Sequence, residues 1–286
     1  MQTVKLGLIG DNIASSSAPR LHKLAAAQHG FDLTYDLIIP KTFGFDFDQA
    51  FDYVQSQGFN GVNITLPYKE KAFPYVAISG PSIKQLGSVN TICFDGQTPT
   101  GHNTDFTGFL KSYRSVRGNK PPGHVLLIGA GGVGRSIAYA IMEIGASSIS
   151  ILDHDHAKAQ RLSDELNALP QKQSVGIATA IYAQSIPSCD AVINCTPKGM
   201  VGYGGLPLPE DAFPADFEWV FDAVYQPVDT LLKHFAERKG AQFISGFELF
   251  FYQGVDAFLI FTGHDVKDQD DLRQSLYAAL DDNAKG

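Results

Sequence analysis

The chain has 286 residues, of which 44% are hydrophobic and 18% charged, and its formal net charge is −8. This length favours two domains, and the composition excludes a disordered chain. The acidic balance argues against nucleic acid or an anionic membrane as a partner. The three cysteines, Cys93, Cys189 and Cys195, form no C-x-x-C pair, so we expect no disulfide framework, no metal site and a reducing cytoplasm.

Predicted strands and helices alternate along the first part of the chain, a pattern typical of parallel α/β sheets. We predict strands at 4–9, 33–38 and 60–64, and helices at 19–29 and 45–57. No signal segment precedes the first strand, and no apolar run is long enough to span a bilayer, so we expect a soluble, unexported protein. A helix from about Thr104 then runs into the Pro/Gly-rich stretch 117–123, which we interpret as a linker to a second domain.

A glycine-rich turn follows the apolar run 125–128 and precedes an apolar-periodic stretch at 137–144. Gly129 permits a tight turn, Gly131 lets the backbone approach a pyrophosphate, and Gly134 lets the helix pack close to the strand. The N–H groups at the start of the helix then face phosphate. We therefore expect a dinucleotide to bind the turn Gly129, Ala130, Gly131, Gly132, Val133 and Gly134.

Asp153 ends the next strand-like run, 148–152, and lies 19 residues after Gly134. This is close to the spacing expected for a carboxylate that binds ribose hydroxyls, and such a carboxylate favours NAD over NADP because it repels a 2′-phosphate. Lys158 is within reach of a phosphate, so NADP stays a less favoured alternative. Asp153 also has a second interpretation, as the cap of the following helix.

The remaining elements continue the alternation. After Asp153 we predict a helix at 155–168, strands at 175–181, 191–194 and 219–222, and a helix at 229–238. The last amphipathic region, 247–261, is rich in phenylalanine, and we expect it to pack back on the first domain.

Polar residues gather at predicted strand ends, where ligands bind in parallel sheets. The clusters are 15–17, 63–69, and 90–91 together with 103–105. Each residue has a structural alternative, because serines cap helices, asparagines hold turns, and Lys69 beside two other charged residues fits a solvated face. Their number, in a chain with a cofactor turn, favours a site for a hydroxylated anionic small molecule.

These segments, in this order, resemble the shikimate/quinate dehydrogenase family. The resemblance extends from about residue 4 to 263. It rests on 58–69 (GFNGVNITLPYK), 86–91 (LGSVNT), 101–105 (GHNTD), 129–134, 193–200 (INCTPKGM), 221–225 (FDAVY) and Gln253.

The resemblance implies a two-domain α/β protein that oxidises the ring hydroxyl of shikimate, quinate or both with NAD. Residues 1–104 would form a parallel-rich α/β substrate domain completed by helices in 247–286, and 105–246 a doubly wound Rossmann domain that binds the dinucleotide, with a cleft between them. Lys69 and Asp105 would form the catalytic pair, and Thr196 and Gly246 would lie near the cofactor. The residues implied to contact substrate, besides Asp105, are Ser16, Asn63, Thr65, Asn90, Tyr225 and Gln253.

Two departures from the family pattern bear on specificity. NADP-type members carry Asn-Arg-Ser/Thr where this chain has Asp153-His154-Asp155, which is similar to the NAD-using branch. The serine-rich loop has Ala18 where a second carboxylate-binding hydroxyl is usual, although Ser15, Ser17 or Arg20 are placed to compensate. The alternatives are a dehydrogenase of a related ring acid such as aminoshikimate, or a non-catalytic NAD-sensing protein of the same fold. We expect a monomer or a homodimer.

Overall fold

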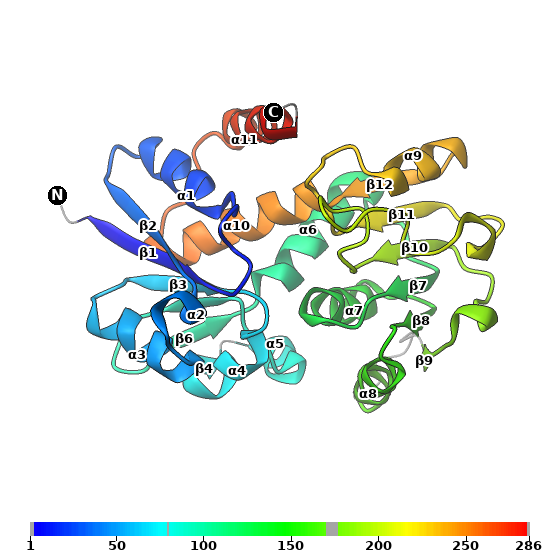
Figure 1. Cartoon of the computed structure of the whole chain (residues 1–286), viewed down its shortest axis with the longest axis horizontal. Helices are drawn as coiled ribbons and strands as arrows, with labels where there is room; N and C mark the ends of the chain where they lie inside the picture. Colours follow the sequence, from blue (N-terminus) through cyan, green and yellow to red (C-terminus); the bar gives the residue numbers. More distant parts are fainter. Residues whose placement is uncertain (1–2, 79, 170–176, 285–286) are drawn as a thin grey trace. The chain divides into compact units, whose positions relative to one another are not determined.

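The computed structural model describes residues 3–78, 80–169 and 177–284. The chain forms two compact units (Figure 1). Unit 1 combines Met1–Thr104 with Phe251–Ala279, and unit 2 combines Asp105–Phe250 with Leu280–Gly286. Each unit is built around its own sheet.

Unit 1 contains a six-stranded sheet in the order β2-β1-β3-β5-β6-β4. Its strands are β1 (Val4–Ile9), β2 (Leu33–Ile38), β3 (Gly61–Ile64), β4 (Ala77–Ile78), β5 (Thr91–Cys93) and β6 (Thr100–His102). β1 pairs in parallel with β2 and β3, as predicted, but β5 runs antiparallel to both β3 and β6. The expectation of a parallel-rich sheet is confirmed, and the short connection from β5 to β6 permits only antiparallel pairing of these two strands.

The helices of unit 1 include the two predicted ones, which correspond to α1 and α3. α3 begins with a capping box between Asp46 and Gln49. The shorter helices lack enough turns to show an apolar period, which is why the sequence did not predict them. The helices are α1 (Ala18–Ala27), α2 (Pro40–Phe43), α3 (Phe47–Ser56), α4 (Lys69–Ala72), η1 (Phe73–Tyr75), α5 (Pro81–Leu86), the second part of α10 (Gly246–Thr262) and most of α11 (Gln269–Ala284).

The Phe-rich segment packs on the sheet of unit 1, as predicted. Ala257 and Phe261 of α10 share a buried cluster with Leu6 and Leu8 of β1. The contact is close, because a Cβ on Gly61 would lie 2.4 Å from Cδ1 of Phe261. Glycine at this position therefore allows the helix to reach the sheet.

Unit 2 is a doubly wound sheet, all parallel, in the order β12-β11-β10-β7-β8-β9. Its strands are β7 (His124–Ile128), β8 (Ser148–Leu152), β9 (Ile177–Ala180), β10 (Ala191–Asn194), β11 (Trp219–Asp222) and β12 (Gln242–Ser245). Its helices are α6 (Thr104–Arg117), α7 (Gly132–Ile144), η2 (Ala183–Ser185), α8 (His156–Asn167), η3 (Glu210–Ala212), α9 (Leu231–Arg238) and the start of α10. α8 packs against β8 and β9, and α9 against β11 and β12 (Figure 1).

The strands and helices predicted for this unit are present, with small differences at their ends. α7 begins at Gly132, ahead of the predicted 137, because the glycines of the turn already form its first residues. The beginning of the strand predicted at 175–181 lies outside the described residues. β12 was not predicted, since its four residues include a single fully buried apolar side chain, Ile244.

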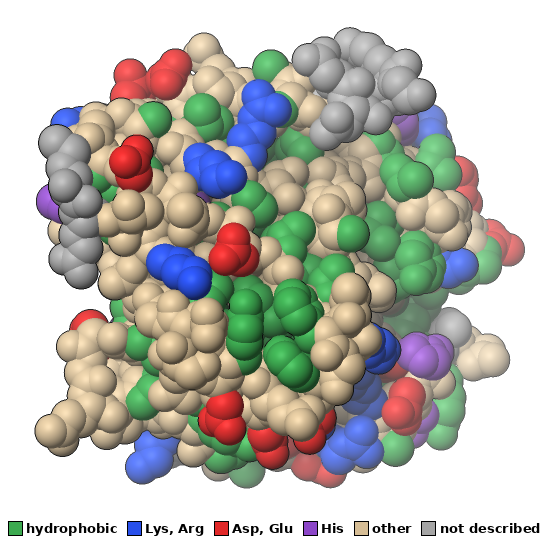
Figure 2. Space-filling view, turned by 60° about the vertical axis from the view of Figure 1, so that its left-hand side comes forward, with side chains coloured by type: hydrophobic (Ala, Val, Ile, Leu, Met, Phe, Trp, Pro, Cys, Tyr) green, Lys and Arg blue, Asp and Glu red, His purple; other side chains and the backbone are tan. Residues whose placement is uncertain are grey.

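The surface mixes both signs of charge. On the face drawn in Figure 2, Lys and Arg side chains alternate with Asp and Glu, and hydrophobic side chains gather near the centre. Among the described residues, no helix is long and apolar enough to cross a bilayer.

Candidate active site

The glycine turn of unit 2 has the geometry that its sequence predicts. Gly129 has a φ of +99°, a left-handed conformation that favours glycine. A Cβ on Gly134 would lie only 1.9 Å from the carbonyl oxygen of Gly129, so the close packing of helix on turn requires glycine. A Cβ on Gly131 would meet no atom of the protein within 4 Å. Protein packing therefore does not explain glycine at 131.

The start of α7 can hold an anion. Its N-cap is Gly131, and no side chain caps the helix there. The N–H groups of the first turn and the positive end of the helix dipole are therefore suited to a phosphate. Gly132, Val133 and Gly134 supply this first turn, and the neighbouring N–H of Ala130 is already donated to Asp153 Oδ2 at 2.7 Å.

Asp153 lies at the end of β8, beside the glycine turn. Its side chain is only 6% exposed, and Oδ1 lies 2.9 Å both from the backbone N of Asp155 and from Nδ1 of His154. Asp155, not Asp153, caps α8, because its side chain accepts the N–H of Lys158. The interpretation of Asp153 as the helix cap was therefore wrong, and its carboxylate is fixed against the turn, where a ribose-binding group belongs.

A buried polar network lies at the ends of β10 and β11, which are neighbouring strands of the same sheet. Asn194 donates to Asp222 Oδ1 at 2.9 Å, and its own Oδ1 accepts both the N–H and the hydroxyl of Thr196. Thr230 donates to the other oxygen of Asp222 at 2.7 Å. Asp222 thus positions the Thr196 loop through Asn194.

Two further predicted site residues lie near the end of β11. A Cβ on Gly246 would lie 2.5 Å from the carbonyl oxygen of Ala223, so packing alone requires this glycine. The ring of Tyr225 stacks on Phe250, with ring centroids 4.9 Å apart, and burial raises the pKa of its hydroxyl to about 12. Tyr225 is therefore a protonated phenol at neutral pH.

Asp222 gives this unit a predicted pH dependence. Burial raises the pKa of its carboxyl from 3.8 to about 6, against the opposing hydrogen bonds from Thr230, Val224 and Asn194. A carboxyl with a raised pKa binds more protons in the folded than in the unfolded chain between about pH 4 and pH 6. Its contribution to stability is therefore fully present below about pH 4 and is lost as the pH rises to about 6.

Asp222→Asn should remove this dependence, since asparagine has no proton to lose. Between about pH 4 and pH 7, the wild-type free energy of unfolding should fall by on the order of 3 kcal/mol relative to the variant. Denaturant titrations across this range measure the difference. The exposed Asp216→Asn variant is the control and should follow the wild type; parallel curves for wild type and Asp222→Asn would contradict the prediction.

In unit 1, the loops after β1 and β3 meet at one edge of the sheet. Thr65 donates its N–H to Ile9 O at 2.9 Å, and Asp11 donates to Leu66 O at 3.1 Å. The adjacent loop carries Ser16, whose hydroxyl accepts the N–H of Ala18 at 3.3 Å. Two of the sequence clusters thus share the carboxyl ends of neighbouring parallel strands.

Three predicted substrate residues belong to one hydrogen-bonded network in this unit. Asn63 Nδ2 donates to Thr91 Oγ1 at 3.0 Å, and Thr91 donates to Asn90 Oδ1 at 3.0 Å. Asn90 Nδ2 donates to Thr104 Oγ1 at 3.0 Å, and Thr104 Oγ1 lies 3.4 Å from Gln253 Oε1. The sheet and α10 thereby bring together side chains up to 190 positions apart in the chain.

The two predicted catalytic residues are each buried. Lys69 is 6% exposed and begins α4, and its carbonyl accepts the N–H of Val89 at 3.0 Å, next to the network. Asp105 is also 6% exposed and directly follows Thr104 at the start of α6. Lysine and aspartate are seldom buried this deeply without a partner or a function, which argues against the interpretation of Lys69 as a solvated surface residue.

Several residues of these networks were given no individual role from the sequence. Thr91 and Thr104 belong to the predicted polar clusters, and in the structure they join the predicted asparagines. Asn194, Asp222 and Thr230 hold the Thr196 loop. The available signal was the repeated Asn-Thr pair at 90–91 and 103–104, which places hydroxyls next to amides. Spacing alone did not indicate which partner each hydroxyl would meet.

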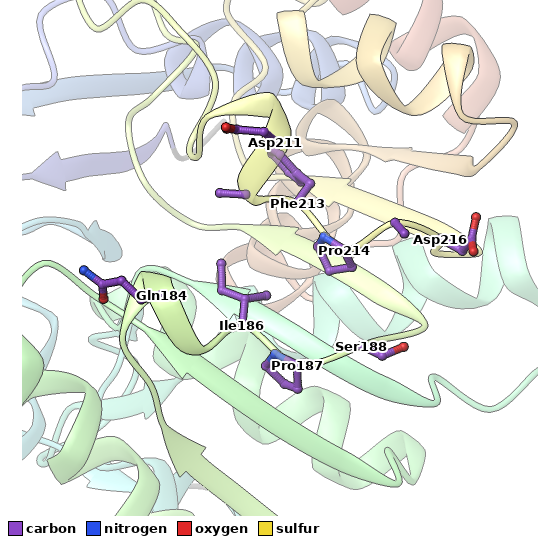
Figure 3. Close-up of a pocket in the computed structure, with 10 residues that line it drawn as sticks. Gln184, Ile186, Pro187, Ser188, Asp211, Phe213, Pro214 and Asp216 are labelled. Carbon is purple, nitrogen blue, oxygen red and sulfur yellow. The ribbon is translucent and has the colours of Figure 1, made fainter.

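A pocket of about 490 Å³ in unit 2 is lined by none of the predicted site residues (Figure 3). Its lining comes from Gln184, 186–188 and 211–216, in the segments that precede β10 and β11. Because the sheet is parallel, this edge is opposite to the glycine turn. The lining carries Asp211 and Asp216 and no cation, so it is unsuited to a dinucleotide phosphate.

Known family models match a segment of each unit. Residues 8–92 match the model of the shikimate dehydrogenase substrate binding domain, and residues 125–200 match that of the saccharopine dehydrogenase NADP binding domain. The quinate/shikimate dehydrogenase (NAD(+)) of Corynebacterium efficiens is 34% identical over 267 residues, covering 91% of this chain and 93% of the relative. The chain belongs to the shikimate/quinate dehydrogenase family.

Other members of the shikimate/quinate dehydrogenase family use either cofactor. The shikimate dehydrogenase (NADP(+)) of Pseudarthrobacter chlorophenolicus is 34% identical over 265 residues, covering 91% of this chain and 90% of the relative. The solved quinate dehydrogenase from Corynebacterium glutamicum in complex with NAD has a TM-score of 0.87 at 32% identity, covering 96% of this chain and 99% of that one. The family is one of NAD(P)-dependent enzymes, and its fold is the two-unit α/β architecture described above.

Proposed function

We propose that this protein oxidises the ring hydroxyl of quinate and shikimate, giving 3-dehydroquinate and 3-dehydroshikimate, with NAD as the hydride acceptor. The observation that carries the proposal is the burial of Lys69 in the unit that holds the Asn63–Asn90–Gln253 network. A protein that only sensed NAD would not need a buried lysine there. The quinate/shikimate dehydrogenases named above support the choice of substrates.

Each proposed residue has a chemical task. NAD, when bound, supplies the carbon that accepts the hydride. Lys69 takes the proton of the reacting hydroxyl and returns it in the reverse direction, while Asp105 orients the lysine and a neighbouring hydroxyl. The ring acid is held by hydrogen bonds, which fix it for transfer. These come from Ser16, Asn63, Thr65, Asn90, Tyr225 and Gln253.

The cofactor half fits NAD better than NADP. Asp153 is fixed beside the glycine turn by Ala130, and its charge attracts ribose hydroxyls but repels a 2′-phosphate. We assign the nucleotide to the turn 129–134, with Thr196 and Gly246 near its other end. NADP would have to overcome the repulsion with His154 or Lys158 alone.

Initial rates with quinate and shikimate, each with NAD and NADP, test the function. We expect turnover of both acids and a higher specificity constant with NAD. NAD binding without reduction in the presence of either acid would favour the sensing protein. Turnover only with another ring acid, such as aminoshikimate, would identify the alternative substrate.

We also propose a cytoplasmic location, with which the state of the thiols is consistent. All three cysteines are free, and burial raises the pKa of Cys93 and Cys189 to about 11. They therefore stay protonated at neutral pH and serve as small apolar side chains.

Ala18→Ser should shift the preference between the two acids. α1 begins at Ala18, next to the Ser16 hydroxyl, in the loop proposed to bind the substrate carboxylate. One added hydrogen bond should strengthen shikimate binding by about 0.5–1.5 kcal/mol. Quinate carries an extra hydroxyl on the tetrahedral carbon next to the carboxylate and needs more room, so the preference should move towards shikimate.

Michaelis constants for both acids in wild type and variant measure this shift. Ala27→Ser adds the same hydroxyl at an exposed position of the same helix and is the control. A ratio that stays constant or moves towards quinate would show that residue 18 does not face the carboxylate end.

A further inference from the structure

Two buried rings pack against each other behind the polar network of unit 1. His22 of α1 and Tyr35 of β2 are stacked, with centroids 5.0 Å apart and planes at 17°. Their exposed fractions are 1% and 6%. Phe258 and Phe261 of α10 contact the histidine ring, with centroids at 6.2 and 5.7 Å. An imidazole and a phenol in such an apolar setting need a polar partner to offset the loss of water.

Both rings find that partner in Asn63. The hydroxyl of Tyr35 donates to Asn63 Oδ1 at 2.8 Å, and the Asn63 side chain also lies within hydrogen-bonding reach of the His22 ring. Nδ1 of His22 is buried without a hydrogen-bond partner. Burial lowers the pKa of His22 to about 3, so the ring is neutral at pH 7.

The hydrogen-bond partners of Asn63 determine which way its amide faces. With Oδ1 accepting from Tyr35, Nδ2 donates to Asn90 O at 3.2 Å and to Thr91 Oγ1 at 3.0 Å. A rotated amide would place its oxygen against the Asn90 carbonyl, which can only accept a hydrogen bond. The observed orientation satisfies the Tyr35 hydroxyl, the Asn90 carbonyl and the Thr91 hydroxyl together, and the reverse would lose the bond to the carbonyl.

The orientation of Asn63 bears on the rest of the network. Thr91 accepts from Asn63 and therefore donates its own proton to Asn90 Oδ1, which also accepts the N–H of Thr104 at 2.7 Å. Asn90 Nδ2 is thereby directed to Thr104 Oγ1, which lies beside Gln253. The orientation of Asn63 thus sets which atom donates in each of these hydrogen bonds.

We propose that His22 and Tyr35 are positioning residues for substrate recognition, which hold Asn63, and through it Asn90 and Gln253, in the arrangement that binds the ring hydroxyls. The proposal rests on the proposed function for the nature of the substrate. Neither ring is assigned a contact with substrate. A purely structural role for the pair would affect stability alone.

Tyr35→Phe removes one hydrogen bond and leaves the ring. We expect the KM for quinate and shikimate to rise about 2- to 13-fold, the equivalent of one net hydrogen bond, while the KM for NAD changes less than about twofold. Tyr113→Phe is the matched control, because Tyr113 is a fully buried tyrosine of unit 2 whose hydroxyl donates to Lys120 O at 2.8 Å. This control should lower the melting temperature about as much as Tyr35→Phe does. It should leave the KM for the ring acids and the KM for NAD unchanged.

The histidine is tested by two variants. Glutamine can place an amide N–H near the position of Nε2, whereas phenylalanine keeps the stacking but donates nothing. We expect His22→Gln to retain the ring-acid KM better than His22→Phe, even where both lose stability. Equal KM values in the two variants would overturn the positioning role of His22.

Crystal structures of wild type and Tyr35→Phe show the position of the Asn63 amide and the distances to its hydrogen-bond partners without any assay of activity. We expect the amide of Asn63, or the side chains of Thr91 and Asn90, to rearrange in the variant. An unchanged network together with unchanged ring-acid KM would overturn the proposal. Absence of turnover by the wild type contradicts the proposed function instead, and the crystal structures still decide whether the rings position Asn63.

Discussion

Replacing Lys69 with alanine should lower the turnover number on the order of 100-fold or more, the usual contribution of a positioned proton-transfer group. The reason is that no other residue is proposed to take the hydroxyl proton. The KM for NAD should stay near wild type, because the glycine turn and Asp153 are in the other unit. Steady-state kinetics with quinate and NAD, at saturating concentrations of each, provide the measurement.

Lys71→Ala is the matched control for this variant. Lys71 lies two residues further along α4 but is exposed, whereas Lys69 is buried. Loss of a positive charge at 71 should leave turnover within about twofold, far below the loss expected for a proton-transfer group. A Lys69→Ala enzyme with near-normal turnover would remove Lys69 from the mechanism.

Asp105→Asn should have a mixed effect. The variant keeps the shape of the side chain and loses the charge that is proposed to orient Lys69. We therefore expect both a lower turnover number and a higher KM for the ring acid, with NAD affinity unchanged. An effect on NAD affinity alone would place Asp105 with the cofactor and contradict its proposed pairing with Lys69.

The second large effect concerns the cofactor. The double variant Asp153→Asn, His154→Arg should narrow the preference for NAD over NADP by about tenfold or more, since hydrogen bonds to charged groups contribute about 1.5–3 kcal/mol. Asparagine removes the charge that repels the 2′-phosphate and keeps an oxygen for the Ala130 N–H. Arginine at 154 adds a bidentate phosphate partner at a side chain that is 96% exposed.

Specificity constants for NAD and NADP in wild type and variant measure this change. Asp164→Asn removes the same charge from an exposed position of α8 and should leave the preference unaltered. A wild type that uses NADP as well as NAD would show that Asp153 does not select the cofactor. An unchanged ratio in the double variant would lead to the same conclusion.

The sequence by itself determined the nucleotide half of this protein. Gly129, Gly131, Gly134 and Asp153 are near one another along the chain, and each meets a local demand of a strand, turn and helix. Such demands depend on φ angles, Cβ contacts and spacing, which are readable without knowledge of distant contacts. The choice of NAD followed from the same short segment.

The tertiary structure alone decided the partners of the polar residues in unit 1. His22, Tyr35 and Asn63 are on three different elements, and Gln253 comes from a helix near the other end of the chain. The sequence showed these side chains individually, but their hydrogen bonds depend on the order and direction of strands, including the antiparallel β5 that was not predicted. Because burial makes each unpaired polar atom costly, the sheet that buries them also fixes which atoms pair.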